Sequence, residues 1–193
     1  MDSTPVTVPV PVTVHQPLEL INTGRSRFWV IADYSPDYFS VVNTLPLESK
    51  PPIMIMGQEC RQQRDVGFFS DSSEGYRYSG TLMKSQVITA GVTGVTGVTA
   101  ANQFLAWLLP VVNTSLSTQF NGILVNRYNS GQDYLSAHSD SESGLDPNKK
   151  SVAGISYGAT RTFRIRDKLS KTIVLDYCLR LCRHSRHVNG HGG

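Results

Sequence analysis

The stretch that decides the fold runs from Phe120 to Gly144 and reads FNGILVNRYNSGQDYLSAHSDSESG. It places His138 two positions before Asp140. Side chains two positions apart point away from each other on a helix but share a face on extended backbone. His138 and Asp140 are therefore expected to present one nitrogen and one oxygen ligand side by side. Such a pair supplies two-thirds of the 2-His-1-carboxylate set that holds non-heme Fe(II).

Short strands separated by glycine-containing turns are expected on both sides of this motif. Five are predicted after Asn121, at Ile123–Tyr128, Tyr134–Ser139, Val152–Tyr157, Thr162–Arg166 and Thr172–Tyr177. Upstream, the patterns predict strands at Arg27–Ile31 and Ile53–Met56, a helix starting at Ser35–Asp37, and a helix at Ala100–Leu109 that Pro110 ends or kinks. Many short strands with glycine turns indicate a sandwich or barrel.

Three further segments complete a recognisable order: GQECRQQRDVGFF at 57–69, GYRYSG at 75–80 and SVAGISYGATRTFRIRDK at 151–168. Together with 120–144 they resemble the AlkB family of Fe(II)/2-oxoglutarate oxygenases, in particular members similar to human AlkB homologue 2. The resemblance implies a mainly β (α+β) fold, a double-stranded β-helix or jelly roll with flanking N-terminal helices. We expect this domain to span residues 18–193, after a flexible leader rich in Pro, Val and Thr at residues 1–17.

The resemblance also implies roles for individual residues. His138 and Asp140 map onto the iron ligands, and Asn126 and Tyr128 onto residues that bind 2-oxoglutarate. The positions that map onto contacts with the nucleobase or nucleic acid are Tyr76, Tyr78, Arg64, Glu142 and Arg161. Some of these residues could instead have a purely structural role. His138 could be a histidine hydrogen-bonded near a strand end, Asn126 and Tyr128 a polar pair at a strand edge, and Glu142 an exposed loop carboxylate.

The C-terminal sequence departs from the family pattern. The family continues with a distal histidine ligand and an R-x-N-x-T-F-R-like strand, whereas residues 178–193 read CLRLCRHSRHVNGHGG. We expect a chain that is truncated or altered here, with an incomplete 2-oxoglutarate anchor. The third iron ligand is left among His184, His187 and His191. A zinc site at Cys178, Cys182, His187 and His191 is the competing interpretation, but four residues between its halves are far fewer than the roughly 12–15 of zinc fingers.

Composition fits one intracellular globular domain, in the nucleus or cytoplasm. The 193 residues are 39% hydrophobic, which suffices for an ordinary core. No apolar run approaches the roughly 18 residues of a membrane span, so we expect no membrane partner, and the N-terminus does not read as a secretory signal. Three cysteines suit a reducing compartment better than a disulfide framework. We expect a monomer.

The charge distribution bears on the substrate. Eight of the 18 Lys and Arg residues lie between Arg161 and Gly193, so the last part of the chain is basic. A basic segment favours a polyanion such as DNA or RNA, although a solvated basic tail is an equally acceptable interpretation.

The expected function is oxidative demethylation of N-alkylated bases in DNA or RNA, with Fe(II), 2-oxoglutarate and O2. One alternative is a non-catalytic nucleic-acid-binding or regulatory remnant of the fold. A second is a 2-oxoglutarate oxygenase that acts on protein.

Overall fold

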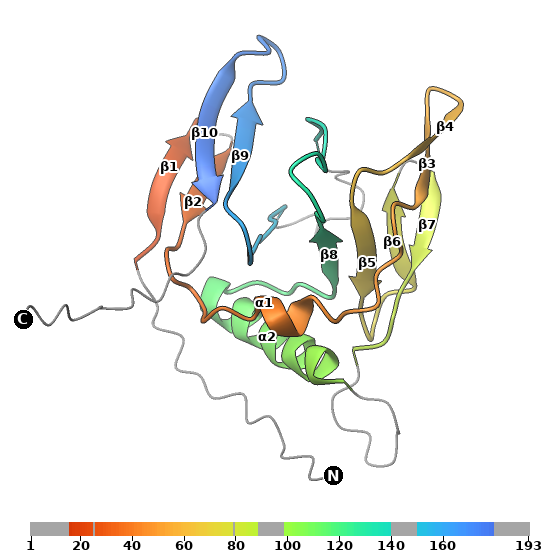
Figure 1. Ribbon diagram of the computed structural model, residues 1–193. Coiled ribbons are helices and arrows are strands. Elements are labelled where there is room, and N and C mark those ends of the chain that lie inside the picture. The colour runs from red at the N-terminus through yellow and green to blue at the C-terminus, as the bar shows by residue number, and fades with distance from the viewer. Residues whose placement is uncertain (1–15, 25, 79, 89–98, 140–149, 180–193) are drawn as a thin grey trace, which may run out of the picture. The chain divides into compact units, whose positions relative to one another are not determined.

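Short antiparallel strand pairs dominate the architecture (Figure 1). The computed structural model describes residues 16–24, 26–78, 80–88, 99–139 and 150–179. In these ranges the pairs are β1 (Leu18–Asn22) with β2 (Arg27–Val30), β3 (Pro52–Ile55) with β4 (Gln58–Arg61), β5 (Asp65–Phe69) with β8 (Ile123–Arg127), β6 (Gly75–Tyr78) with β7 (Thr81–Lys84), and β9 (Arg161–Arg166) with β10 (Ile173–Leu179). The mainly β class is confirmed, while closure into a jelly roll stays a prediction.

The chain divides into two units. The larger is built mainly from Ser40–Ala153 and holds β3 to β8 with helix α2 (Ala100–Leu116). The other combines Pro9–Phe39 with Gly154–Gly193 and holds β1, β2, β9 and β10. Helix α1 (Phe39–Val42) lies at the border. A single domain over residues 18–193 and a leader over residues 1–17 stay predictions.

Strand β5 is the centre of the larger unit. All five of its residues are buried, and it pairs in continuous register with β8, from Asp65 opposite Arg127 to Phe69 opposite Ile123. Its other edge is also hydrogen-bonded, because Val66 and Glu48 exchange two backbone hydrogen bonds. A strand that is paired on both sides and buried on both faces has to be apolar, which explains the sequence Val-Gly-Phe-Phe after Asp65.

Helix α2 lies beneath the β5–β8 pair in the view of Figure 1. Its N-cap is Thr99, whose hydroxyl accepts a hydrogen bond from the backbone N–H of Asn102 at 3.2 Å. Its buried stripe consists of Ala101, Phe104, Leu105, Leu108 and Val112.

The helix does not stop near Pro110, as the sequence had suggested, but continues to Leu116. Proline costs a helix one backbone hydrogen bond. Leu108 and Val112, on either side of Pro110, are both buried, and this packing holds the helix together across it.

The smaller unit contains two hairpins that meet through aromatic side chains. Phe28 of β2 and Phe163 of β9 stack with ring centroids 5.6 Å apart and an interplanar angle of 10°. Across the β9–β10 hairpin, Arg164 donates two hydrogen bonds to Asp176, at 2.6 and 2.7 Å. The predicted strands at Arg27–Ile31, Thr162–Arg166 and Thr172–Tyr177 are confirmed to within a few residues.

Several expectations are wrong. Residues 134–139 and 152–157 form no strand. Tyr134 N–H donates to the carbonyl of Gln63, but this single bond starts no ladder. Ser35 does not cap a helix: its hydroxyl bonds Tyr157 and the Pro36 carbonyl, and α1 begins only at Phe39, whose N–H donates to Asp37. In the described part, no helix is both long and apolar enough to span a membrane.

Candidate active site

The two residues predicted to bind 2-oxoglutarate lie near the end of strand β8 and directly after it. Asn126 lies opposite Val66 of β5, and Tyr128 follows the end of the strand; both side chains are half-buried. In the described part of the chain, Oδ1 of Asn126 is buried and has no hydrogen-bond partner. Because native proteins rarely leave such an atom unpaired, Asn126 is suited to a polar ligand at this point.

His138 lies on an exposed segment that has no regular secondary structure. Its Nδ1 is 2.8 Å from the carbonyl oxygen of Ser136. A carbonyl can only accept, so Nδ1 carries the proton and the lone pair of the neutral ring is on Nε2. A metal-binding histidine is usually held by this kind of hydrogen bond from its second ring nitrogen. The ring of His138 therefore fits a metal ligand.

Arg64 and Tyr78 lie next to His138. The ring of Tyr78, at the end of β6, meets the His138 ring edge-on, with centroids 6.5 Å apart. The Arg64 guanidinium lies 5.5 Å from the centre of the same tyrosine ring. Arg64 is only 3% exposed, and its Nε donates to Gln62 at 3.1 Å. Three predicted site residues from separate segments are thus brought together by contacts with a single aromatic ring.

The remaining predicted residues are distributed differently. Tyr76 lies two positions before Tyr78 on β6, and its ring lies beside that of Phe68, with ring centroids 5.9 Å apart. Arg161 begins β9 in the smaller unit, opposite Leu179. Other predicted site residues lie outside the described ranges, namely Asp140 and Glu142, the alternative ligands His184, His187 and His191, and the zinc candidate Cys182.

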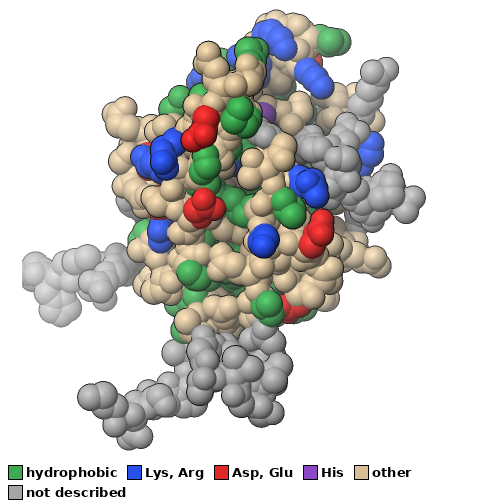
Figure 2. Space-filling view, turned by 90° about the vertical axis from the view of Figure 1, so that its right-hand side faces the viewer, with side chains coloured by type: hydrophobic (Ala, Val, Ile, Leu, Met, Phe, Trp, Pro, Cys, Tyr) green, Lys and Arg blue, Asp and Glu red, His purple; other side chains and the backbone are tan. Residues whose placement is uncertain are grey.

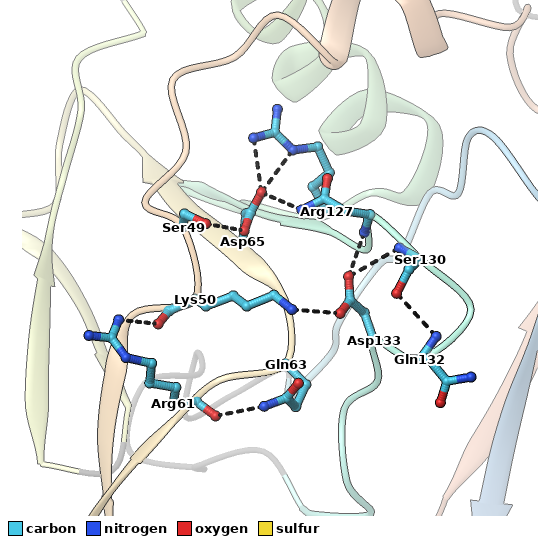
Figure 3. A network of polar contacts seen from close by, with 10 residues as sticks. Ser49, Lys50, Arg61, Gln63, Asp65, Arg127, Ser130, Gln132 and Asp133 are labelled. Atoms are coloured by element: carbon cyan, nitrogen blue, oxygen red, sulfur yellow. Dashed lines mark hydrogen bonds and ion pairs between the residues drawn. The ribbon is translucent and has the colours of Figure 1, made fainter.

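A polar network around two buried carboxylates beside β8 was missed by sequence reasoning (Figure 3). Oδ2 of Asp65 accepts from Arg127 at 3.0 and 3.2 Å and from Asn129 at 2.8 Å, while Oδ1 accepts from Ser49 at 3.0 Å. Burial by itself raises the pKa of Asp65, but the hydrogen bonds from Asn129, Arg127 and Ser49 outweigh it and lower the pKa below its usual value. An acidic residue at the start of an otherwise apolar strand was the signal that could have revealed this network.

Asp133 is the second carboxylate of the network. Its side chain is 2% exposed and accepts hydrogen bonds from the backbone N–H groups of Asn129 and Ser130, at 2.7 and 3.1 Å, and from Lys50 Nζ at 3.0 Å. The Lys50 hydrogen bond is the largest influence on the pKa of Asp133, which lies below its usual value. Both carboxylates hold Asn129, one through its side chain and one through its backbone.

These residues are compatible with an iron and 2-oxoglutarate site. His138 offers a nitrogen ligand. The amide NH2 of Asn126 is the group that could donate a hydrogen bond to a carboxylate of 2-oxoglutarate, because its unpaired Oδ1 only accepts and the co-substrate has no donor. No group of three or more His, Cys, Asp or Glu residues suited to a metal occurs within the described ranges, which exclude Asp140. A surface hollow of about 80 Å³ next to Tyr78, lined also by Ile53, Gln62 and Leu82, is well below the roughly 300 Å³ of ordinary ligand pockets.

Comparison with known proteins gives a consistent result. The profile of the 2OG-Fe(II) oxygenase superfamily matches residues 43–180. The chain is similar to the DNA oxidative demethylase ALKBH2 of Homo sapiens, with 28% identity over 62% of this chain and 40% of the relative. It is also similar to the protein of the same name from Arabidopsis thaliana, with 27% identity over 62% of this chain and 35% of the relative. The protein of that name from Mus musculus is 44% identical over 27% of this chain and 21% of the relative. The matches thus span less than half the length of these curated relatives.

Proposed function

Because this chain belongs to the 2OG-Fe(II) oxygenase superfamily, we propose that it uses Fe(II), 2-oxoglutarate and O2 to remove alkyl groups oxidatively from bases in DNA or RNA. The observation that carries the proposal is the contact of Arg64, Tyr78 and His138 in the same unit as the half-buried Asn126. The names of its AlkB-like relatives support a nucleic-acid substrate.

His138 and Asp140 would hold the iron, together with a third ligand, and Asn126 and Tyr128 would hold 2-oxoglutarate. When bound, Fe(II) would activate O2, the oxidant, so that one oxygen atom enters succinate as 2-oxoglutarate loses CO2 and the other enters the methyl carbon, which would leave the base as formaldehyde. The Ser136 carbonyl fixes the orientation and tautomer of the His138 ring. The amide NH2 of Asn126 would donate a hydrogen bond to a carboxylate of the co-substrate.

Tyr78, Tyr76 and Arg64 would contact the base. An alkylated base must leave the stack to be oxidised, and aromatic faces and guanidinium planes are the surfaces against which such bases rest. Glu142 and Arg161 are further candidate contacts from the family resemblance. On the face drawn in Figure 2, basic, acidic and hydrophobic side chains are interspersed.

The β3–β4 hairpin offers an additional contact in the larger unit. Its tip exposes Met54, Ile55 and Met56, and Met56 is completely exposed, with a φ of 49°. Nucleic-acid-binding proteins use displayed apolar side chains of this kind as wedges between base steps. The exposed tip is therefore compatible with a contact to a nucleic acid.

The proposal is tested first by anaerobic titration of the protein with Fe(II) and 2-oxoglutarate, recording the visible charge-transfer band of the chelate. We expect a band that disappears in His138→Ala and persists in the control His15→Ala. A folded protein without a band would refute the oxygenase assignment and leave a binding remnant. Formaldehyde release from N-methylated DNA and RNA oligonucleotides then tests the substrate, and release only from methylated protein would replace nucleic acid with protein.

A further inference from the structure

The turn between β8 and His138 is held from one side by an ion pair between the buried carboxylate of Asp133 and the partly exposed Lys50. The turn covers residues 129–134, and Asp133 is the last buried residue before His138. Its carboxylate receives the backbone N–H groups of Asn129 and Ser130 together with Lys50 Nζ. Three donors on one buried carboxylate define the path of the turn, because displacing the carboxylate would leave all three without their acceptor.

The partner segments of the turn are the two ends of the β3–β4 hairpin. Lys50 precedes β3 and reaches Asp133 across 83 positions of sequence, with 3.0 Å between Nζ and Oδ1 (Figure 3). Gln63 follows β4, and its carbonyl accepts a hydrogen bond from Tyr134 N–H at 3.0 Å. Arg61 also donates to the Lys50 carbonyl, at 3.4 Å, which links the hairpin ends to each other.

The segment after the turn is mostly exposed. Residues 134–139 form no strand, and every residue in them except the half-buried Leu135 is exposed. The ring of His138 meets Tyr78 and the Ser136 carbonyl, but Ser136 belongs to the same segment. The position of His138 relative to β8 therefore depends on the anchoring of the preceding turn as well as on the contact with Tyr78. In catalytic sites a displacement of about 1 Å can cost about 100-fold in rate.

We propose that Lys50 and Asp133 form a positioning pair that sets the place of the His138 segment relative to Asn126 and Tyr128. The inference rests on the proposed function, since it assigns the pair a consequence for metal and co-substrate binding. Neither residue touches the reacting atoms. Lys50 holds the carboxylate of Asp133, Asp133 holds the backbone of the turn, and the turn sets where the chain leads into His138.

The experiment measures Mn(II) affinity in the presence of 2-oxoglutarate, for the full chain and for Lys50→Met, Lys50→Gln and Lys50→Arg. Substitution of groups that orient metal ligands typically weakens metal binding by about 10–100-fold, and we expect a loss in that range for Lys50→Met and Lys50→Gln. Lys50→Arg restores a cation and should recover most of the affinity. Asp176→Asn, which breaks the exposed ion pair with Arg164, is the matched control and should bind Mn(II) like the unmodified chain.

Amide hydrogen exchange separates the possible outcomes. We expect faster exchange at Asn129, Ser130 and Tyr134 in Lys50→Met, together with weaker Mn(II) binding at temperatures well below unfolding. Faster exchange with unchanged Mn(II) affinity would overturn the positioning role while leaving the proposed function intact. Failure of the unmodified, folded chain to bind Mn(II) with 2-oxoglutarate would overturn the proposed function, and this inference with it. If Lys50→Met does not fold, the same comparison is made with Lys50→Gln.

Discussion

Asp65→Asn should destabilise the protein, and by an amount that depends on pH. Asn has nearly the same shape as Asp, so the substitution removes the charge while keeping one acceptor oxygen. The Asp65 side chain is 3% exposed and its partner Arg127 is 29% exposed. Breaking a fully buried ion pair costs about 3–5 kcal/mol. Because Arg127 retains some solvent and its hydrogen bond to the Asn43 carbonyl, we expect about 2–3 kcal/mol at neutral pH.

The sign of the pH dependence follows from the direction of the pKa shift. The pKa of Asp65 in the folded protein is lowered. Its contribution to stability is therefore fully present above the unfolded-state pKa of about 3.9 and is lost as the pH falls through the lower folded-state pKa. The difference in free energy of unfolding between the unmodified chain and Asp65→Asn should shrink below about pH 4.

Urea unfolding followed by circular dichroism at several pH values measures this difference. Asp176→Asn serves as the control, because it removes an ion pair of similar geometry whose two side chains are 55% and 42% exposed. The control should lose much less stability at neutral pH. A difference for Asp65→Asn that stays constant from neutral pH to about pH 3 would refute the reasoning, since the charge of Asp65 would then contribute nothing.

Three further changes test the core, a helix cap and the co-substrate residue. Phe69→Ala should cost about 3–5 kcal/mol in urea unfolding, because Phe69 is 0% exposed, whereas Leu169→Ala, at a site 92% exposed, should stay within about 0.5 kcal/mol. Thr99→Ala should cost about 1 kcal/mol through the lost N-cap of α2, and Thr99→Ser should restore most of it; equal losses would exclude the hydroxyl as the cause. Asn126→Ala should raise the KM for 2-oxoglutarate by about tenfold, measured as succinate formation, with little change in Tm; an unchanged KM would remove Asn126 from the proposed site.

Local patterns predicted a useful part of the fold. The strand that became β8, the two strands β9 and β10 and the start of helix α2 were all expected from the sequence. These features depend on neighbours a few positions apart, whose spacing follows the period of a strand or a helix. The pattern at Tyr134–Ser139 predicted a strand that does not form. A strand needs a neighbouring strand to pair with, and the backbone hydrogen bond from Tyr134 N–H to the Gln63 carbonyl is not continued into a ladder in this described segment.

For the candidate site, the sequence supplied the residue types but only some of their relations. Arg64, Tyr78 and His138 were each singled out by motif, and the structure brings them into contact. Asp140 and Glu142 lie outside the described residues, so their roles stay predictions. Neither Asp65 nor Asp133 was selected, because an isolated acidic residue gives no indication in sequence of which cation will meet it.

The sequence by itself determined the family, the mainly β class and the order of the motifs, because each is carried by residues close together along the chain. Only the tertiary structure decided that α2 continues past Pro110, and that Lys50 meets Asp133 and Arg127 meets Asp65 across 83 and 62 positions. The reason is physical. Short-range periodicity is set by backbone geometry, whereas the choice of distant partners depends on which side chains packing brings out of water together, where a buried charge needs an opposite one.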